Sequence, residues 1–136
     1  MLARQVAVAV LTLLSLVGSN ALAQEQSETR QSATVGVPFE ITLVANPSTG
    51  YQWRIDRSSS ANLESVRIED LGTSPPRSKD GRPLIGAPVT HNWLIAPLEA
   101  GSVRLVLTYS RAWESEPPAK THTFVIEVAD GNSQKR

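Results

Sequence analysis

The segment FEITLVANPSTGYQWRID, residues 39–56, decides the fold of this 136-residue chain. Its two ends, 39–45 and 51–56, alternate apolar and polar side chains with a period of two, and a loop of turn-forming residues lies between them. Such alternation places the apolar side chains on one face of an extended strand. The segment therefore predicts two β-strands joined by a short loop, in which the odd-numbered residues from Phe39 to Ala45 face a core.

Four further segments are strand-like, although the first of them is weak: 63–68, 92–96, 103–109 and 123–128. Clusters of proline, glycine and aspartate separate them, as is typical of turns. No stretch of the sequence has the helical period of 3.6 over three turns. Six or seven short strands with turns between them predict an all-β sandwich of immunoglobulin-like size, with a small barrel as the competing architecture.

The N-terminal residues differ in kind from the rest of the chain. A single basic residue, Arg4, precedes an apolar run over 6–17, and the sequence Ala-Leu-Ala follows at 21–23. This order is that of a secretory signal peptide and predicts cleavage after Ala23. The alternative, a membrane anchor, requires about 20 apolar residues, which is more than this run provides. We therefore expect an exported protein, periplasmic or secreted, from which residues 1–23 have been removed.

The rest of the chain divides by composition into three parts. Residues 24–34 are polar without periodicity, and we expect them to be a flexible leader. Residues 35–130 hold all the predicted strands and form one domain, which is long enough to bury a core without a metal or a disulfide. Residues 131–136 are expected to be a disordered tail.

Composition excludes several classes of function. The chain has 13 basic and 13 acidic residues and no cysteine. Without cysteine there is no disulfide scaffold, thiolate metal site or cysteine nucleophile. The balanced charge provides no basic surface for nucleic acid or anionic lipid. We expect a monomer without cofactor or metal that binds neither nucleic acid nor, once the signal is removed, a membrane.

Residue types that carry catalysis are scattered along the chain. The two histidines, His91 and His122, fall on separate predicted strands, and no acidic residue is spaced to complete a metal or triad motif with either of them. Neither a phosphate-binding glycine loop nor a nucleophile elbow occurs. We interpret both histidines as solvent-facing or hydrogen-bonded strand residues, and we expect that the chain is not an enzyme.

The three tryptophans have different surroundings in the sequence. Trp53 alternates in register with Tyr51, which predicts core packing, whereas Trp93 is compatible with core or rim. Trp113 lies past the end of a predicted strand, in the loop SRAWE at 110–114, before two prolines that no core strand tolerates. Arginine and tryptophan most often anchor protein interfaces. We therefore predict that Trp113 is an exposed contact residue.

The composition of the loop NPSTG at 46–50 restricts its conformation. Pro47 has a fixed φ and favours an extended Asn46. Ser48 and Thr49 can hydrogen-bond to the backbone of the loop, and Gly50 permits the positive φ needed to re-enter a strand. An ordinary β-turn and a binding loop are both compatible with these residues, because recognition is often placed on loops of a rigid scaffold.

Three motifs, taken in order, resemble those of the chagasin family of cysteine-peptidase inhibitors. They are Asn46-Pro47-Ser48-Thr49-Gly50-Tyr51, then Gly86-Ala87-Pro88, and then Arg111-Ala112-Trp113 after Tyr109-Ser110. The resemblance covers roughly residues 35–128 and implies an immunoglobulin-like β-sandwich that carries three inhibitory loops. It also implies reversible, non-covalent occlusion of the cleft of a papain-like peptidase. Thr49 would then lie nearest the catalytic centre, offering backbone and hydroxyl groups, and Arg111 and Trp113 would supply the hot spot.

Two departures from the family pattern affect the second and third loops. The second loop reads Gly86-Ala87-Pro88-Val89, where the pattern has a further glycine, and Ala112 stands in the place of a proline. Losing that proline frees one φ and raises the cost of ordering the loop by about 0.4–1 kcal/mol. We expect weaker or altered selectivity rather than loss of inhibition.

The alternative function is an exported adhesion or carbohydrate-binding module. An exposed indole on the same scaffold could stack on a sugar ring. This alternative leaves the loop at 46–50 without an explanation.

Overall fold

Seven strands and two short 3-10 turns make up the computed structural model, which describes residues 25–75, 80–82 and 86–131. In chain order the elements are β1 (Glu25–Thr34), β2 (Phe39–Ala45), η1 (Pro47–Thr49), β3 (Tyr51–Ile55), η2 (Leu63–Ser65), β4 (Val66–Ser74), β5 (Val89–Pro97), β6 (Gly101–Arg111) and β7 (Lys120–Ala129). The predicted signal peptide and residues 132–136 of the predicted tail lie outside the described residues. Within the described ranges, no helix is long and apolar enough to cross a membrane.

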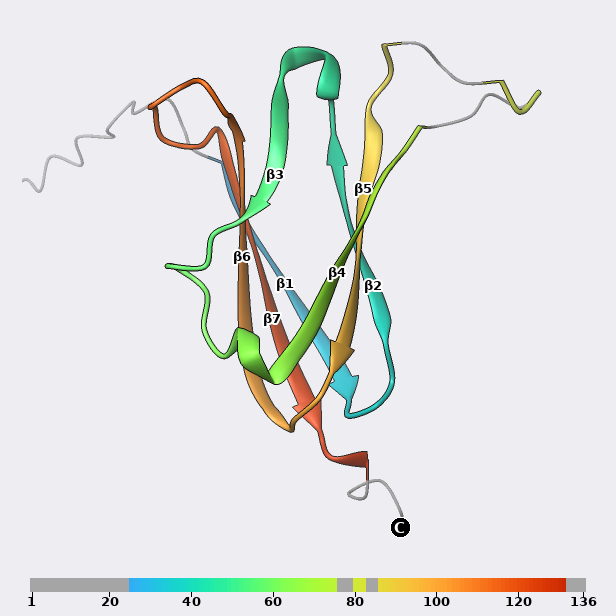
Figure 1. Ribbon diagram of the computed structural model, residues 1–136, viewed down its shortest axis with the longest axis vertical. Helices are drawn as coiled ribbons and strands as arrows, with labels where there is room; N and C mark the ends of the chain where they lie inside the picture. Colours follow the sequence, from blue (N-terminus) through green and yellow to red (C-terminus); the bar gives the residue numbers. More distant parts are fainter. Residues whose placement is uncertain (1–24, 76–79, 83–85, 132–136) are drawn as a thin grey trace, which may run out of the picture.

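The strands form two sheets that face each other (Figure 1). One sheet has the order β1-β7-β6-β3 and the other has the order β2-β5-β4. Neighbouring strands are antiparallel except for β1 and β7, which are parallel. The all-β sandwich of seven strands is therefore confirmed, and the competing barrel is wrong.

Apolar side chains from both sheets fill the space between them. Those with an exposed fraction of 0% are Ile95, Val103, Leu107 and Ile126. The alternation of β2 works as predicted, because Ile41 and Ala45 are buried in this core. Trp53 is 7% exposed and Trp93 is 2% exposed, so both belong to the core. This confirms the prediction for Trp53 and decides between the two alternatives for Trp93.

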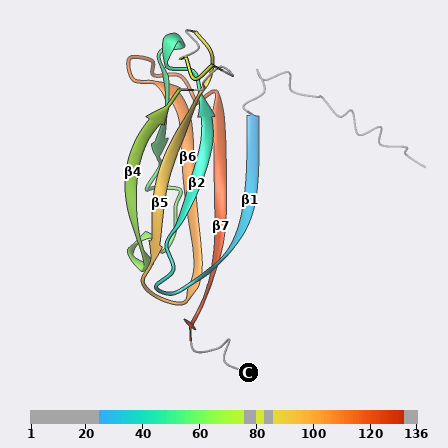
Figure 2. The same cartoon turned by 90° about the vertical axis from the view of Figure 1, so that its right-hand side faces the viewer.

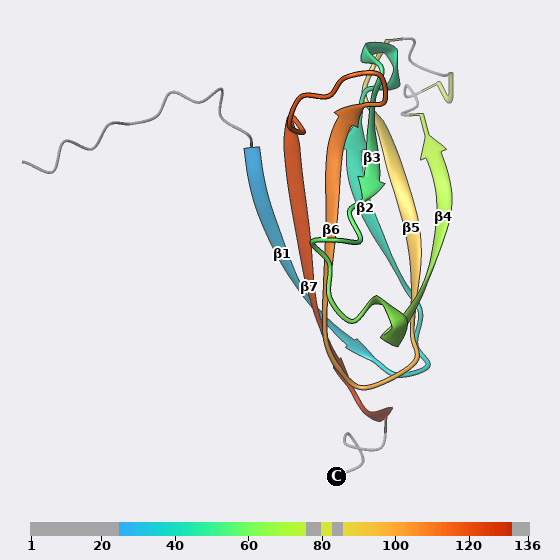
Figure 3. The same ribbon diagram turned by 60° about the vertical axis from the view of Figure 1, so that its left-hand side comes forward.

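The segment expected to be a flexible leader instead forms β1, so that prediction is wrong for residues 25–34. This strand pairs with β7 over its whole length, from Glu25 opposite Lys120 to Thr34 opposite Ala129. It runs along the outside of β7 as an edge strand (Figure 2, Figure 3). An edge strand is held by backbone hydrogen bonds on one side and needs no buried face, so its polar sequence carries no period-two signal.

One side chain of β7 also holds β1 in place. The imidazole nitrogens of His122 share hydrogen bonds with the hydroxyls of Ser27, at 2.5 Å, and Thr29, at 2.8 Å. The interpretation of His122 as a hydrogen-bonded strand residue is confirmed. His122 therefore connects β1 to the neighbouring strand β7 through side chains, in addition to the backbone pairing.

The weak strand expected at 63–68 begins later and extends further than predicted. Leu63–Ser65 forms the 3-10 turn η2, and β4 runs on to Ser74. Gly72, which resembles a turn residue in the sequence, lies at a β-bulge inside β4, where the register with β5 shifts between Asp70 and Gly72. Gly72 has φ +80° and donates its N–H to the carboxylate of Asp70 at 2.8 Å. A glycine that resembles a turn in sequence can therefore mark a bulge.

The up-and-down course of the strands places three connections at the same end of the sandwich. These are the β2–β3 connection, the described part of the β4–β5 connection and the β6–β7 connection, which lie at the top of Figure 1. They contain the three motifs singled out in the sequence. The expectation that the three loops share one end is confirmed.

Candidate functional site

The β2–β3 loop folds on itself as its composition predicts. Asn46 has φ −128° and ψ 87°, so its φ is extended but its ψ falls short of the predicted extended conformation, and Pro47 begins the 3-10 turn η1. The hydroxyl of Ser48 donates to Asn46 Oδ1 at 2.5 Å, and the hydroxyl of Thr49 donates to the Asn46 carbonyl at 2.6 Å. Gly50 closes the turn at φ +82° and donates its N–H to the Pro47 carbonyl at 3.0 Å. The loop is rigid although its tip is exposed.

These hydrogen bonds change what Thr49 can offer to a partner. Its hydroxyl is directed into its own loop, where it also accepts a weak hydrogen bond from the Tyr51 N–H at 3.4 Å. The hydroxyl therefore holds the loop together, as its composition predicts, and its contact with a peptidase stays a prediction. The side chain remains exposed at the tip.

A row of aromatic rings supports the loop from below. Trp53 lies opposite Tyr109 in the β3–β6 register, with ring centroids 4.8 Å apart, and Tyr51 stacks on Tyr109 at 5.2 Å. The hydroxyl of Tyr109 accepts a hydrogen bond from the Asn46 N–H at 2.8 Å, and the indole of Trp53 donates to the Val44 carbonyl at 2.9 Å. Both ends of the first motif are thereby fixed to the core.

Arg111 extends this row into the loops. It is the last residue of β6 and lies opposite Tyr51 in the register, with its guanidinium 4.4 Å from the Tyr51 ring centre. Its Nε–H donates to the Thr49 carbonyl at 2.9 Å, and its Nη1 forms an ion pair with Glu114 at 2.9 Å. The hydrogen bond to Glu114 raises the pKa of the Arg111 guanidinium above its ordinary value. The first and third loops are therefore joined by one side chain.

Trp113 lies at the outer end of the same arrangement. Its side chain is 71% exposed, which confirms that it is not a core residue. The edge of the indole lies against Gly50, so that a Cβ added at Gly50 would overlap the Trp113 ring. Two features therefore require glycine at position 50, namely its positive φ and the close approach of the indole.

The second predicted loop enters β5 at the same end of the molecule. Gly86 has φ +77° and is exposed, Ala87 is half-buried, and Pro88 is exposed. Residues 83–85 of this connection lie outside the described residues. All three loops lie at one end of the sandwich. The hydrogen bonds and ring contacts described above connect the first loop to the third, and none of them involves the described residues of the second loop.

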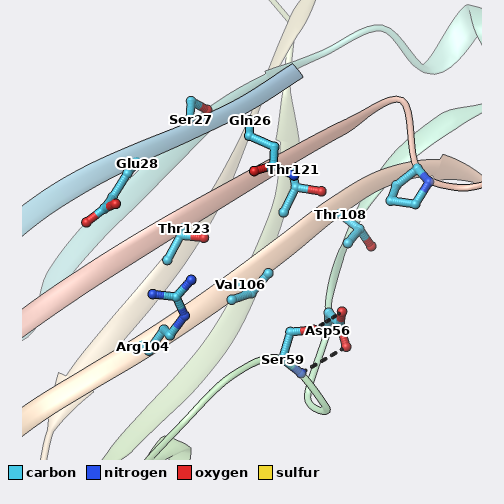
Figure 4. Close-up of a pocket in the computed structure, with 11 residues that line it drawn as sticks. Gln26, Ser27, Glu28, Asp56, Ser59, Arg104, Val106, Thr108, Thr121 and Thr123 are labelled. Carbon is cyan, nitrogen blue, oxygen red and sulfur yellow. Dashed lines mark hydrogen bonds between the residues drawn. The ribbon is translucent and has the colours of Figure 1, made fainter. Parts of the chain in front are cut away.

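A hollow of about 470 Å³ lies over the sheet that contains β1, β7, β6 and β3 (Figure 4). The residues that line it are mostly polar and include Thr108, Thr121, Thr123, Arg104 and Asp56. Hydrogen bonds from Ser58 and Ser59 lower the pKa of Asp56. None of the described lining residues is aromatic, so the hollow has no ring on which a sugar could stack.

A second hollow, of about 460 Å³, lies beside the β2–β3 loop between β3 and β4. His91 lines it, hydrogen-bonds through Nε2 to Asp70 at 2.6 Å and stacks on Trp93. The interpretation of His91 as a hydrogen-bonded strand residue is confirmed. Partial burial opposes ionisation of Asp70, but the bonds from His91 and the Gly72 N–H outweigh it and lower the pKa of Asp70. Among the described residues, no group of three acidic or histidine side chains could hold a metal.

Two residues of the site were missed in the sequence. The sequence places Tyr109 next to the third motif, but its role in anchoring the first loop was not predicted. Glu114 was seen only as a polar residue after Trp113, although it pairs with Arg111. Period two places Tyr109 and Arg111 on one face of β6, and the three-residue spacing of Arg111 and Glu114 suits a turn. These signals could have located both residues.

Comparisons with known proteins agree with this arrangement. A family model described as chagasin family peptidase inhibitor I42 matches residues 32–128. Amoebiasin-2 of Entamoeba histolytica is 28% identical over 107 residues, which cover 75% of this chain and 82% of that protein. Chagasin of Trypanosoma cruzi is 30% identical over 96 residues, which cover 70% of this chain and 83% of that protein.

Solved structures show the same fold. The cysteine protease inhibitor EhICP2 of Entamoeba histolytica superposes with a TM-score of 0.56 at 23% identity, covering 79% of this chain and all (100%) of that chain. PbICP-C, whose structure was solved in complex with falcipain-2, superposes with a TM-score of 0.57 at 20% identity, covering 80% of this chain and 93% of that chain.

Proposed function

The chain belongs to the chagasin family of peptidase inhibitors, and from this premise we propose that it blocks the active-site cleft of papain-like cysteine peptidases with three loops. Members of this family are inhibitors, so the expectation that the chain is not an enzyme is confirmed. The proposed inhibition is reversible and non-covalent. The peptidase meets the end of the sandwich that carries the β2–β3, β4–β5 and β6–β7 loops.

The observation that carries this proposal is the direct link between the first and third loops. The Arg111 Nε–H donates to the Thr49 carbonyl, and the edge of the Trp113 ring lies against Gly50, while the side chains of Thr49 and Trp113 stay exposed. A surface that is ordered before binding loses less conformational entropy when a partner docks. Inhibitors of proteases typically bury roughly 800 Å² on each partner in such preorganised interfaces.

The chemistry of the loop tip favours occlusion over covalent capture. The Thr49 hydroxyl donates to the Asn46 carbonyl within its own loop and so restrains the backbone at the tip. The carbonyl of Thr49 is already held by Arg111. A loop fixed in this way occupies the place of a substrate without presenting a mobile peptide bond for attack. PbICP-C, which shares the fold, was solved in complex with a peptidase, falcipain-2.

We also propose that the inhibitor is exported and acts as a monomer. The order of Arg4, the apolar run and Ala-Leu-Ala at 21–23 supports export. N-terminal sequencing of protein from the secreted or periplasmic fraction should start at Gln24. An intact Met1 in that fraction would contradict cleavage.

Titration of papain with the purified chain tests the proposed function. We expect inhibition that saturates at one inhibitor per enzyme and is reversed by dilution. Thr49→Arg should raise the inhibition constant at least about tenfold, because a long charged side chain then stands at the exposed tip. Thr42→Arg, an exposed threonine on β2, is the matched control and should inhibit like the unaltered chain.

Two results would contradict this proposal in different ways. Failure of the unaltered chain to inhibit papain or any related peptidase would remove the function. Unchanged inhibition by a folded Thr49→Arg protein would move the centre of contact away from the β2–β3 loop.

A further inference from the structure

The turn that carries Trp113 is weakly held by its backbone. Residues Arg111 to Glu114 form a β-turn, in which the Glu114 N–H donates to the Arg111 carbonyl at 3.3 Å, a long hydrogen bond. The second position of the turn is Ala112, whose φ is unrestricted compared with that of a proline. The position of the indole therefore depends on more than the turn itself.

Side chains supply the restraint that the backbone lacks. The Arg111 guanidinium uses Nε–H toward the Thr49 carbonyl and Nη1 toward Glu114 Oε1, each at 2.9 Å. The side chains of Arg111 and Glu114 are 32% and 30% exposed, so their ion pair is partly shielded from water. The flat face of the guanidinium lies over Tyr51, and its centre is 6.0 Å from the Trp113 ring.

We propose that Glu114 is a positioning residue, which orients Arg111 so that the exposed surfaces of Thr49 and Trp113 are presented to the peptidase as one rigid unit. This inference rests on the proposed function and deepens it. Glu114 acts through Arg111. It closes the turn from Arg111 to Glu114 by a charge-assisted bond where the backbone bond is long.

Removing the carboxylate has a defined consequence for the two loops. The guanidinium loses the partner that directs its Nη1 edge, and the Nε–H is then free to leave the Thr49 carbonyl. Trp113 loses the closed turn that holds it against Gly50. The sandwich is unaffected, because Glu114 lies outside both sheets.

Glu116 provides a matched control within the same loop. Its carboxylate also raises the pKa of Arg111 through charge, but it is the Glu114 carboxylate that accepts the hydrogen bond from the guanidinium. Glu114→Gln and Glu116→Gln remove the same charge from neighbouring sites, whereas Glu114→Ala also removes the acceptor. Ala112→Pro restores stiffness by another route, because proline is favoured at the second position of a turn and its φ is fixed.

Papain inhibition by these variants tests the proposal. Glu114→Ala should raise the inhibition constant about tenfold, Glu114→Gln less than that, and Glu116→Gln at most about twofold. Adding Ala112→Pro to Glu114→Ala should recover roughly two- to fivefold of the loss, since the loop is again ordered before binding. Unchanged inhibition by Glu114→Ala, or no recovery in the double variant, would overturn the positioning role.

A measurement without peptidase separates this inference from the proposed function. In the NMR spectrum of the unaltered chain, the Nε–H proton of Arg111 should be protected from exchange with water, and it should stay protected in Glu116→Gln. Glu114→Ala should lose that protection while its melting temperature changes little. Suppose that Glu114→Ala loses the protection but the unaltered chain inhibits no papain-like peptidase. The proposed function then fails, whereas the coupling between the two loops stands. If the protection persists in Glu114→Ala, the coupling is wrong.

Discussion

Trp53 and Trp113 lie at the two ends of one row of stacked side chains, and their surroundings are opposite. Trp53 is 7% exposed, packs against Tyr109 and donates its indole N–H to the Val44 carbonyl. Trp113 is 71% exposed and touches Gly50 through the outer edge of its ring. The inner indole stabilises the fold, whereas the outer indole is held in place but left open to a partner.

The residues between the two tryptophans explain how an exposed site can be rigid. The β3–β6 register puts Trp53 opposite Tyr109 and Tyr51 opposite Arg111, so that core packing continues into the loop end without a break. Tyr51 supports the Arg111 guanidinium, which bonds the first loop. The loops are therefore ordered by contact with a row of side chains that begins in the core at Trp53, although the loop tips themselves are exposed.

Replacing each tryptophan by alanine should have opposite effects on stability and on binding. The loss of stability on replacing Trp53 is the largest effect that we predict. Trp53→Ala should lower the free energy of unfolding by about 3–5 kcal/mol, because it empties a buried aromatic site. Trp113→Ala should change it by less than about 0.5 kcal/mol, as is usual at the surface. The same change should weaken peptidase binding by about 2 kcal/mol or more. Urea unfolding and papain titration measure both quantities.

The contrast between the two tryptophans would be wrong if Trp53→Ala and Trp113→Ala changed stability and inhibition in the same way. A large loss of stability in Trp113→Ala with inhibition preserved would make the outer indole a structural residue. Trp53→Ala that unfolds at the same urea concentration as the unaltered chain would show that the row contributes little to the core.

Two glycines with the same backbone angle sharpen the comparison at the loop end. Gly36 and Gly50 both have φ +82°, but only Gly50 has the Trp113 ring against it, and nothing lies within 4 Å of a Cβ added at Gly36. Either change to alanine should cost roughly 1–2 kcal/mol of stability, because side chains strain this left-handed conformation. Gly50→Ala should in addition displace the indole and weaken papain inhibition several-fold, whereas Gly36→Ala should inhibit normally.

Two measurements check this prediction, namely thermal unfolding and the inhibition constant. Combining Gly50→Ala with Trp113→Ala should remove the overlap, so the two changes should not be additive in binding. Additive losses would show that the indole does not depend on Gly50.

The sequence predicted those parts of the site that depend on local rules. The hydrogen bonds of Ser48 and Thr49 back onto the loop and the positive φ of Gly50 follow from single-residue properties, and the structure has both. Period two likewise predicted the buried Trp53 and located the exposed Trp113 beyond its strand.

What the sequence did not predict depends on contacts between distant segments. β1 is polar on both faces and is held by pairing with β7, so no local pattern marks it. The partner of Arg111 on the first loop follows from the β3–β6 register, which is visible only once the strands are paired. The bulge at Gly72 looks like a turn because turns and bulges both use a glycine with positive φ.

The smallest predicted effect concerns the edge strand, at the opposite side of the sheet from the row of aromatic side chains. Burial lowers the pKa of His122 below its ordinary value of 6.5, since the charged imidazolium is poorly solvated beside β1. Its nitrogens hold the hydroxyls of Ser27 and Thr29, and its ring contacts Phe124. Because the unfolded chain takes up the proton first, this contribution to stability is complete above pH 6.5 and is lost as the pH falls toward the folded pKa.

Melting curves between pH 7 and pH 5 measure this effect. The unaltered chain should lose less than about 4 °C, the shift that roughly 1 kcal/mol produces in a domain of this size. His122→Gln, which keeps hydrogen-bonding groups but does not titrate, should lose less over the same interval. Asp56→Asn is the control, because the carboxyl of Asp56 has a pKa lowered from 3.8 by hydrogen bonds from Ser58 and Ser59 and titrates below this interval. A pH dependence that survives in His122→Gln would mean that acid weakens the sandwich elsewhere than at β1.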